Sequence, residues 1–297
     1  MSELKSSLCV LAGGVLWGTL PLFAKYLAAR GLSPEQIVFF RAGFAALFLL
    51  LWLAARKPFL LRFRLADAWY FAALGIGSIM LFSYCYFRTI ESGGIALAAL
   101  LLYTSPAFVL VFSIILFKEQ VTTRKILAVL CTVAGCACIT GIFSGGTAGF
   151  ALPVILVGLG AGFFYSLYSI FGKYALRRNA ATTVTAYALT FAALGSCFLV
   201  PLPQTLILLA DIPILLVSCG MALCCSVGAF GLYTLGLKGI AASKAGVLAA
   251  VEPVVATLIG IAVFHENASL PTFLGMGLII GATALLNTGA VPGKARQ

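Results

Sequence analysis

The chain has 297 residues, of which 62% are apolar or aromatic and only 9% are charged, and its mean hydropathy is +1.13. Soluble domains carry charge on about a quarter of their residues, so this composition excludes a soluble enzyme, a secreted module and a disordered chain. The net charge of +11 lacks a contiguous basic face with interleaved aromatic residues, so we expect no nucleic-acid partner. The composition predicts an all-α polytopic protein whose surroundings are the lipid bilayer.

Ten apolar runs are each long enough for a membrane helix, which needs about 20 such residues. In chain order they are Ser7–Ala24, Pro34–Leu53, Trp69–Phe87, Gly94–Phe117, Ile126–Phe143, Leu152–Tyr174, Thr183–Leu202, Ile212–Leu235, Ala245–Phe264 and Leu270–Leu286. The gaps between them are short, rich in Gly, Pro and charge, and leave no room for a soluble domain. We interpret the first run as a retained helix, because no small-residue cleavage site with a soluble domain beyond it follows.

The distribution of Lys and Arg predicts the orientation. With the N-terminus inside, the inner segments hold 15 basic residues and the outer segments hold 3. Because basic residues concentrate on the cytoplasmic side, we expect both termini in the cytoplasm and a location in the cell (inner) membrane.

The chain repeats itself at a nearly constant offset. Pro106, Phe117 and Glu119 recur 147 residues later as Pro253, Phe264 and Glu266, and Trp17, Phe23, Lys25 and Tyr26 of the first run match Tyr165, Phe171, Lys173 and Tyr174 at an offset of 148. The predicted repeats are residues 1–147 and 148–297, with five helices each. Five is odd, so the second repeat enters the membrane from the opposite side. Inverted repeats of this kind are typical of alternating-access carriers.

Several motifs resemble the drug/metabolite transporter superfamily, specifically its EamA-type ten-helix members. They are Trp17-Gly18 in the first run, Arg41 with Ala45 in the second, and the segments from Pro106 to Glu119 and from Glu252-Pro253 to Glu266. The resemblance implies a carrier of small metabolites such as amino acids and amines, often an exporter, and leaves the substrate open.

Two ionisable residues lie well inside predicted spans. A charged side chain is energetically costly inside a bilayer, so each of them is a candidate functional residue. Glu252 has three open readings: a group that takes up and releases a coupling proton, a partner for a substrate amine, or a structural acceptor for a neighbouring helix. Arg41 either stabilises the fold or holds a substrate carboxylate with its guanidinium fork.

Other candidate residues are aromatic side chains and prolines. Aromatic side chains deep in the spans could bind an aromatic or cationic substrate or could simply pack against neighbours; they are Trp17, Tyr84, Tyr103, Tyr165, Tyr168, Tyr187 and Tyr233. Pro106 and Pro253, at matched positions, would each remove a helix hydrogen bond and mark a helix break or a gating bend, or a kink without a role in transport. Glycines spaced four apart, at 14/18, 158/162 and 277/281, indicate close helix packing.

Other classes of protein find little support. One His in the chain and nine Cys without a C-x-x-C motif give no metal site, so we expect no metal and no cofactor. An intramembrane enzyme lacks a catalytic set, and a channel lacks repeated filter motifs. We therefore expect a secondary transporter that moves an amino acid or related amine, with organic anions or nucleotide sugars as the alternative substrates. We expect a monomer, with a homodimer as the alternative.

Overall fold

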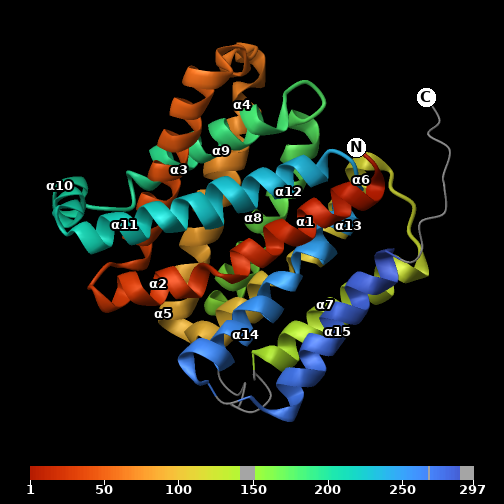
Figure 1. Cartoon of the computed structure of the whole chain (residues 1–297). Helices are drawn as coiled ribbons and strands as arrows, with labels where there is room; N and C mark the ends of the chain where they lie inside the picture. Colours follow the sequence, from red (N-terminus) through yellow and green to blue (C-terminus); the bar gives the residue numbers. More distant parts are fainter. Residues whose placement is uncertain (141–150, 267, 288–297) are drawn as a thin grey trace.

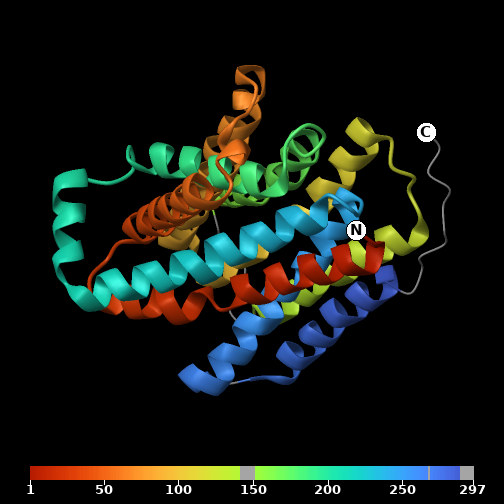
Figure 2. The same ribbon diagram turned by 45° about the horizontal axis from the view of Figure 1, so that its top comes forward.

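The computed structural model describes residues 1–140, 151–266 and 268–287, and every regular element in these ranges is helical. Figures 1 and 2 show a single bundle in which helices distant in sequence lie side by side. The predicted boundary between the repeats, at 147/148, and the end of the fifth predicted span lie outside the described residues.

The first repeat contains seven α-helices and three short segments. They are α1 (Glu3–Gly18), α2 (Leu20–Ala29), α3 (Pro34–Arg56), η1 (Pro58–Leu61), η2 (Leu65–Asp67), α4 (Ala68–Ala72), η3 (Ala73–Met80), α5 (Leu81–Leu102), α6 (Ser105–Phe117) and α7 (Thr123–Ile139). Ser33 and Gln36 form a capping box with Pro34 at the first helical position, which fixes the start of α3.

The second repeat follows the same plan. Its elements are α8 (Leu152–Ala175), α9 (Ala181–Ser196), α10 (Leu202–Ile207), η4 (Leu208–Ala210), α11 (Ile212–Met221), η5 (Ala222–Gly228), α12 (Ala229–Leu237), α13 (Ala242–Ala249), α14 (Val251–Phe264) and α15 (Leu270–Asn287). The segments η3 and η5 are π-helical and occupy corresponding places in the two repeats, within the third and the eighth predicted spans.

Each predicted span corresponds to helix, although not always to one straight helix. Within the described part of the chain, seven helical runs are long and apolar enough to cross a membrane. The fourth, fifth and seventh predicted spans contain shorter helices. These are α6 with 13 residues, α7 with 17 and α9 with 16. The seventh span was predicted too long, because α9 ends at Ser196 and not at Leu202.

The breaks within spans have local causes. Gly94 adopts φ 82° and interrupts α5, a conformation that glycine reaches without steric cost. Lys118 and His265, at φ 52° and 53°, end α6 and α14 in the left-handed conformation. The two repeats therefore end their fourth and ninth spans in the same way, 147 residues apart.

The two repeats pack against each other through antiparallel helices. α7 lies against α15, and Ala128 and Val129 cluster with Ala282 and Leu285 while Cys136 clusters with Met276. Gly135 and Gly275 face each other so closely that a Cβ added to Gly135 would lie 2.7 Å from the Gly275 carbonyl oxygen. The absence of side chains at this crossing allows the two backbones to approach.

Of the predicted glycine pairs, two are confirmed as sites of close packing. Added Cβ atoms at Gly14 and Gly18 would meet residues of α13 and α14, and those at Gly158 and Gly162 would meet α5 and the residues that follow it. The third pair was wrong within the described part of the chain, because a Cβ on Gly277 or on Gly281 would find none of its atoms within 4 Å. The close approach on α15 is made by Gly275 instead.

Candidate functional site

Glu252 lies at a break in the middle of the ninth span. α13 ends at Ala249, and α14 begins at Val251, so Glu252 stands in the first turn of α14. A carboxylate there interacts favourably with the helix dipole and with N–H groups that have no partner within the helix. The break therefore gives this half-buried acid a polar environment inside the bundle.

The Glu252 carboxylate is surrounded by hydroxyl groups and one cation. The Tyr165 hydroxyl, on α8, donates a hydrogen bond to Glu252 Oε2 over 3.4 Å. The hydroxyl of Tyr103, just after α5, also lies against the carboxylate, and Arg41 of α3 interacts with it electrostatically. Residues from both repeats thus meet at one acid.

Arg41 is buried without a partner of its own. Its exposed fraction is 6%, and among the described residues its guanidinium makes no hydrogen bond or ion pair. The ionisable groups within electrostatic range of it are Cys225, Glu252 and Tyr165, of which Glu252 is the carboxylic acid. A buried guanidinium with free donors is costly unless water or a ligand satisfies them, so Arg41 is available to an anionic group.

An aromatic group lies beside this charged pair. The Trp17 ring packs against the rings of Phe230 and Tyr233, with centroids 4.9 and 5.2 Å apart, and against Tyr165 at 6.3 Å. The Tyr168 and Thr234 hydroxyl groups form a hydrogen bond (2.9 Å), and so do the Tyr233 and Ser169 hydroxyl groups (2.6 Å). These rings enclose a cavity of only about 10 Å³, which is room for a single water molecule.

Two of the predicted aromatic residues lie elsewhere. Tyr84 is 40% exposed on the outside of α5, where the Arg88 guanidinium lies 5.4 Å from its ring centroid. Tyr187 donates a hydrogen bond to the Leu61 carbonyl oxygen (2.7 Å) and stacks on Phe71, so it holds the segment after α3 against α9. Depth along a span does not reveal which face of the helix a side chain occupies, so the sequence could not separate these two residues from the aromatic group beside Glu252.

The two prolines mark helix breaks, although by a different route from the one predicted. Pro106 is the second residue of α6 and Pro253 the third of α14. In the first turn of a helix the N–H group has no partner within the helix, so neither proline removes a hydrogen bond. The breaks lie just before them, at Tyr103–Thr104 and at Ala250.

The sequence reasoning missed neighbours of the site. Tyr86 and Cys136 both lie within electrostatic range of Glu252. Tyr86 carried one usable signal, since it pairs with Tyr233 at the repeat offset of 147. The cysteine had none, because a thiol in an apolar run is usually a small hydrophobe.

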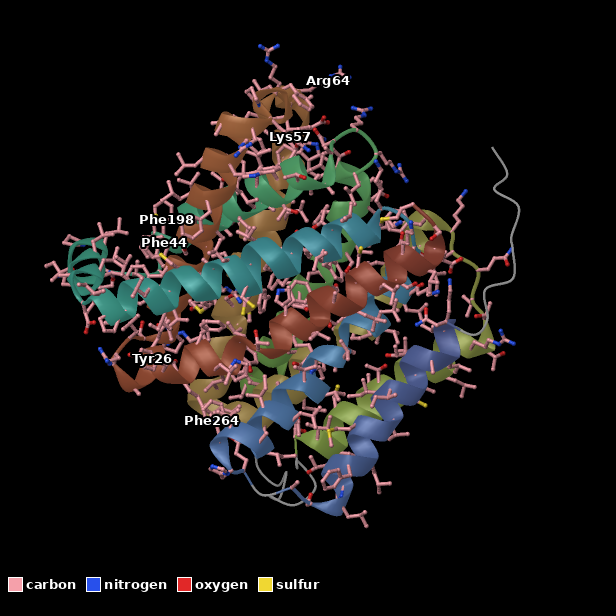
Figure 3. All side chains as sticks on the ribbon, in the orientation of Figure 1. Tyr26, Phe44, Lys57, Arg64, Phe198 and Phe264 are labelled. Atoms are coloured by element: carbon pink, nitrogen blue, oxygen red, sulfur yellow. The ribbon has the colours of Figure 1, made fainter. Side chains whose placement is uncertain are left out.

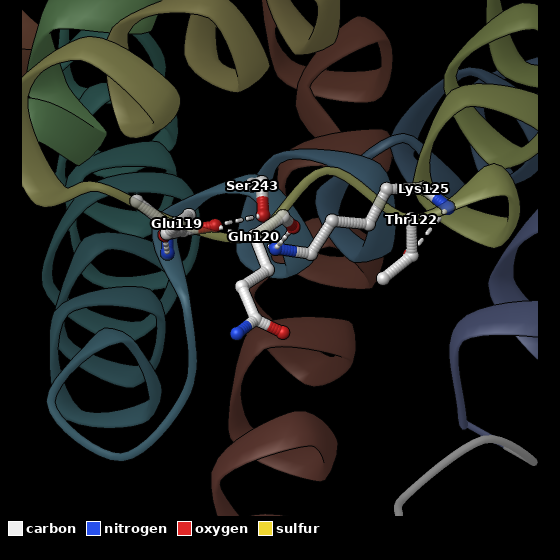
Figure 4. Close-up of polar contacts among 6 residues, drawn as sticks. Glu119, Gln120, Thr122, Lys125 and Ser243 are labelled. Atoms are coloured by element: carbon white, nitrogen blue, oxygen red, sulfur yellow. Dashed lines mark hydrogen bonds and ion pairs between the residues drawn. The ribbon is translucent and has the colours of Figure 1, made fainter.

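A second polar cluster closes the gap between α6 and α13 (Figure 4). Glu119 Oε1 accepts a hydrogen bond from the backbone N–H of Ala242 over 3.2 Å, and Oε2 accepts one from the Ser243 hydroxyl. Lys125 donates to the same Oε2 over 3.0 Å. One carboxylate of the first repeat thus caps a helix of the second.

The family model of the EamA-like transporter family matches this chain twice, over residues 4–141 and 152–288. The chain therefore belongs to the EamA-like transporter family, and it is a multi-pass membrane transporter built from two copies of one unit.

Similar proteins agree with this assignment. An "uncharacterized transporter" of Archaeoglobus fulgidus is 26% identical over 93% of this chain and 94% of its own. The "uncharacterized transporter YwfM" of Bacillus subtilis is 25% identical over 97% and 95%, and the "uncharacterized inner membrane transporter YicL" of Salmonella typhimurium is 20% identical over 96% of each chain. A crystal structure with 22% identity superimposes with a TM-score of 0.77 over 95% of this chain and 96% of that one, so the fold is shared.

Proposed function

We propose that this protein is a secondary transporter that exports an amino acid or a related amine by alternating access. The observation that carries the proposal is that the buried Arg41 lies within electrostatic range of Glu252 without an ion pair between them, and that no group among the described residues occupies its donors. A zwitterion presents a carboxylate and an ammonium group a short distance apart. Arg41 binds the carboxylate as a fork, and Glu252 binds the amine.

The surrounding aromatic residues fit the remainder of such a substrate. Trp17, Tyr165 and Tyr233 present ring faces and edges beside the charged pair. They favour an aromatic or other hydrophobic side chain through stacking and area burial. The alternative substrates, an organic anion or a nucleotide sugar, would need several cations at the site. Arg41 is the cation that acts on Glu252, so the site suits a zwitterion better.

The contacts between repeats support an inverted arrangement. α7 and α15 are the last helices of their repeats, and they run antiparallel. Two helices that correspond in sequence but run in opposite directions are related by an axis in the plane of the membrane, which is the basis of alternating access. The cavity of about 10 Å³ among the aromatic rings is too small for any metabolite, so these rings must separate before a substrate side chain enters between them.

The ion pairs support the proposed arrangement of crossings, and the bias of basic residues sets its direction, with both termini in the cytoplasm of a cell whose inner membrane holds the protein. Each pair joins groups assigned to the same face: Lys25–Glu266 and Arg30–Asp211 outside, and Lys244–Glu3, Lys125–Glu119 and Arg178–Asp67 inside. Figure 3 agrees, since Lys57 and Arg64 lie at one end of the molecule and Tyr26 and Phe264 toward the other. The site forms within one chain, so we propose that a monomer suffices.

Counterflow in proteoliposomes tests the substrate class. Three labelled probes share one ring system: phenylalanine, phenethylamine without the carboxylate, and 3-phenylpropionate without the amine. We expect saturable exchange of phenylalanine, faster than that of either other probe. Arg41→Gln should reduce the preference for phenylalanine over phenethylamine, and Glu252→Gln should reduce the preference for phenylalanine over 3-phenylpropionate. Tyr84→Phe, on the outer surface, is the matched control and should exchange normally. Exchange of the acid alone would overturn the zwitterion and favour the organic anions.

A further inference from the structure

A groove of about 580 Å³ opens on the side of the bundle between α3 of the first repeat and α9, η5 and α12 of the second. Its walls are apolar and include Leu51 and Trp52 from α3, Leu223 from η5, and Leu235 from α12. These four side chains are 40–59% exposed, so the groove opens toward the surrounding lipid. Figures 1 and 2 both show α3, α9 and α12 as neighbours on this side.

The length of the groove matches one leaflet of a bilayer. Leu223 and Leu235 lie at its two ends along η5 and α12, twelve residues apart in the sequence. At about 1.5 Å per residue this is about 18 Å, and half of a hydrocarbon core of about 30 Å is about 15 Å. An acyl chain of ordinary length therefore fits from end to end.

One end of the groove is strongly basic. The Lys57 ammonium lies 5.7 Å from the centroid of the Trp52 ring, which lines the groove. Arg56, Arg62 and Arg64 are exposed nearby in sequence. The acid of this segment, Asp67, is 1% exposed, and Arg178 lies 3.7 Å from its carboxylate and offsets its charge. Figure 3 places Lys57 and Arg64 together at this end of the molecule.

The start of α9 adds hydrogen-bond donors at the groove. Ala181 and Thr182 line it, and the residue before them, Ala180, provides no side-chain cap. The first N–H groups of α9 therefore have no partner within the helix, and they attract an anion.

We propose that this groove binds one anionic glycerophospholipid, with an acyl chain along α12 and the phosphate between Lys57 and the start of α9. Because the walls come from both repeats, the bound chain fills the seam between them and stabilises the arrangement seen here. The lipid touches neither Arg41 nor Glu252, so the proposal stands or falls independently of the substrate.

Gly231 provides a way to fill the groove without disturbing the fold. It lines the groove on α12, and an added Cβ would meet no atom of the described residues within 4 Å. Gly231→Leu therefore occupies space that the acyl chain needs. Gly277→Leu is the matched control, since Gly277 also lies on a helix and also has nothing within 4 Å.

Fluorescence quenching by brominated lipids measures the binding. The protein is reconstituted in phosphatidylcholine with a small fraction of either brominated phosphatidylglycerol or brominated phosphatidylcholine. The signal of Trp52 is the part of the emission that Trp52→Phe removes. We expect phosphatidylglycerol to quench Trp52 more strongly at equal mole fraction. We expect Lys57→Gln to reduce this preference about fivefold, which corresponds to about 1 kcal/mol for one cation at the surface.

Gly231→Leu should abolish the preference while Gly277→Leu retains it, with the unfolding temperature of each variant as the check on folding. Equal quenching by the two lipids in the unaltered protein overturns the proposal, as does a preference that survives Gly231→Leu. Light scattering gives a further outcome: a dimer that Gly231→Leu dissociates would assign the groove to a second copy of the chain.

Discussion

Glu119 and Glu266 hold the same place in the two repeats but bind different partners. Each follows a left-handed residue that ends a helix, and each donates its backbone N–H to a carbonyl six residues back, Ser113 at 3.2 Å and Gly260 at 3.0 Å. The Glu119 carboxylate reaches across to the start of α13, whereas that of Glu266 pairs with Lys25. In the proposed orientation, the contact of Glu119 with the start of α13 therefore joins the two repeats at the inner end of the site. Glu266, at the outer end, does not make the equivalent contact.

Glu119→Gln should loosen the start of α13. The carboxylate accepts hydrogen bonds from Ala242 and Ser243, and bonds to a charged group contribute about 1.5–3 kcal/mol each. We expect amide hydrogen exchange in a peptide covering Ala242–Ala249 to accelerate about tenfold or more. The experiment needs no substrate. Glu266→Gln is the control and should leave this peptide unchanged, and equal exchange in both variants would remove the fastening role of Glu119.

Glu252→Gln should separate coupling from exchange. The amide keeps an acceptor for the Tyr165 hydroxyl but cannot release a proton. If Glu252 carries the coupling proton as well as binding the amine, pH-driven accumulation is lost while exchange of substrate persists with a weaker preference for the amino acid. Glu252→Asp retains part of the coupling. Uptake and exchange are measured in the same vesicles. Unchanged pH-driven accumulation in Glu252→Gln would assign this residue a structural role.

Reporter fusions should confirm the orientation. A reporter that is active only outside the cytoplasm should be silent after the last residue and after Lys118, because both positions follow an inward crossing. The same reporter should be active after Gly31 and after Pro201, which follow outward crossings. The reason is the bias of 15 inner to 3 outer basic residues. Strong activity at the C-terminus would overturn both the orientation and the inverted repeat.

Gly275→Ala should destabilise the seam between α7 and α15. The added Cβ would lie 2.5 Å from the Gly135 carbonyl oxygen and 2.9 Å from Cys138 Cβ. Overpacking of this kind costs about 1–3 kcal/mol, so we expect the unfolding temperature in detergent to fall by several degrees. Gly277→Ala, on the same helix, meets nothing within 4 Å and should not lower it. An equal fall of the unfolding temperature in both variants would show that the substitution acts on α15 itself and not on its contact with α7.

Periodicity and charge predicted the fold well, since a membrane helix can be recognised in a sequence from the length and hydropathy of its apolar run alone. The ten predicted spans all contain helix, and the repeat offset of 147 marked equivalent residues that the structure gives the same backbone conformation. What could not be predicted was the direction in which side chains point. Tyr84 and Tyr165 looked equivalent in the sequence, yet one faces outward beside Arg88 and the other donates to Glu252.

The contacts across repeats were also out of reach of the sequence. The repeat marked Glu119 in the sequence, but nothing there pointed to its partners Ala242 and Ser243, which are more than 120 positions away. The same holds for Gly135 and Gly275, which have no partner at four-residue spacing and owe their role to where α7 and α15 cross.

The paired π-helices, η3 and η5, bear on the ancestry of the chain. A π-helical turn accommodates one residue more than an α-helical turn, and the insertion of one residue into an α-helix can produce such a turn. Both turns contribute buried side chains to the interior: η3 supplies Ser78 to the aromatic cavity, and η5 supplies Cys225, within electrostatic range of Arg41. A single insertion that preceded the duplication accounts for both. The half-length ancestor would then already have carried the wide turn, and two such chains lying antiparallel in a membrane would have assembled an early form of this bundle.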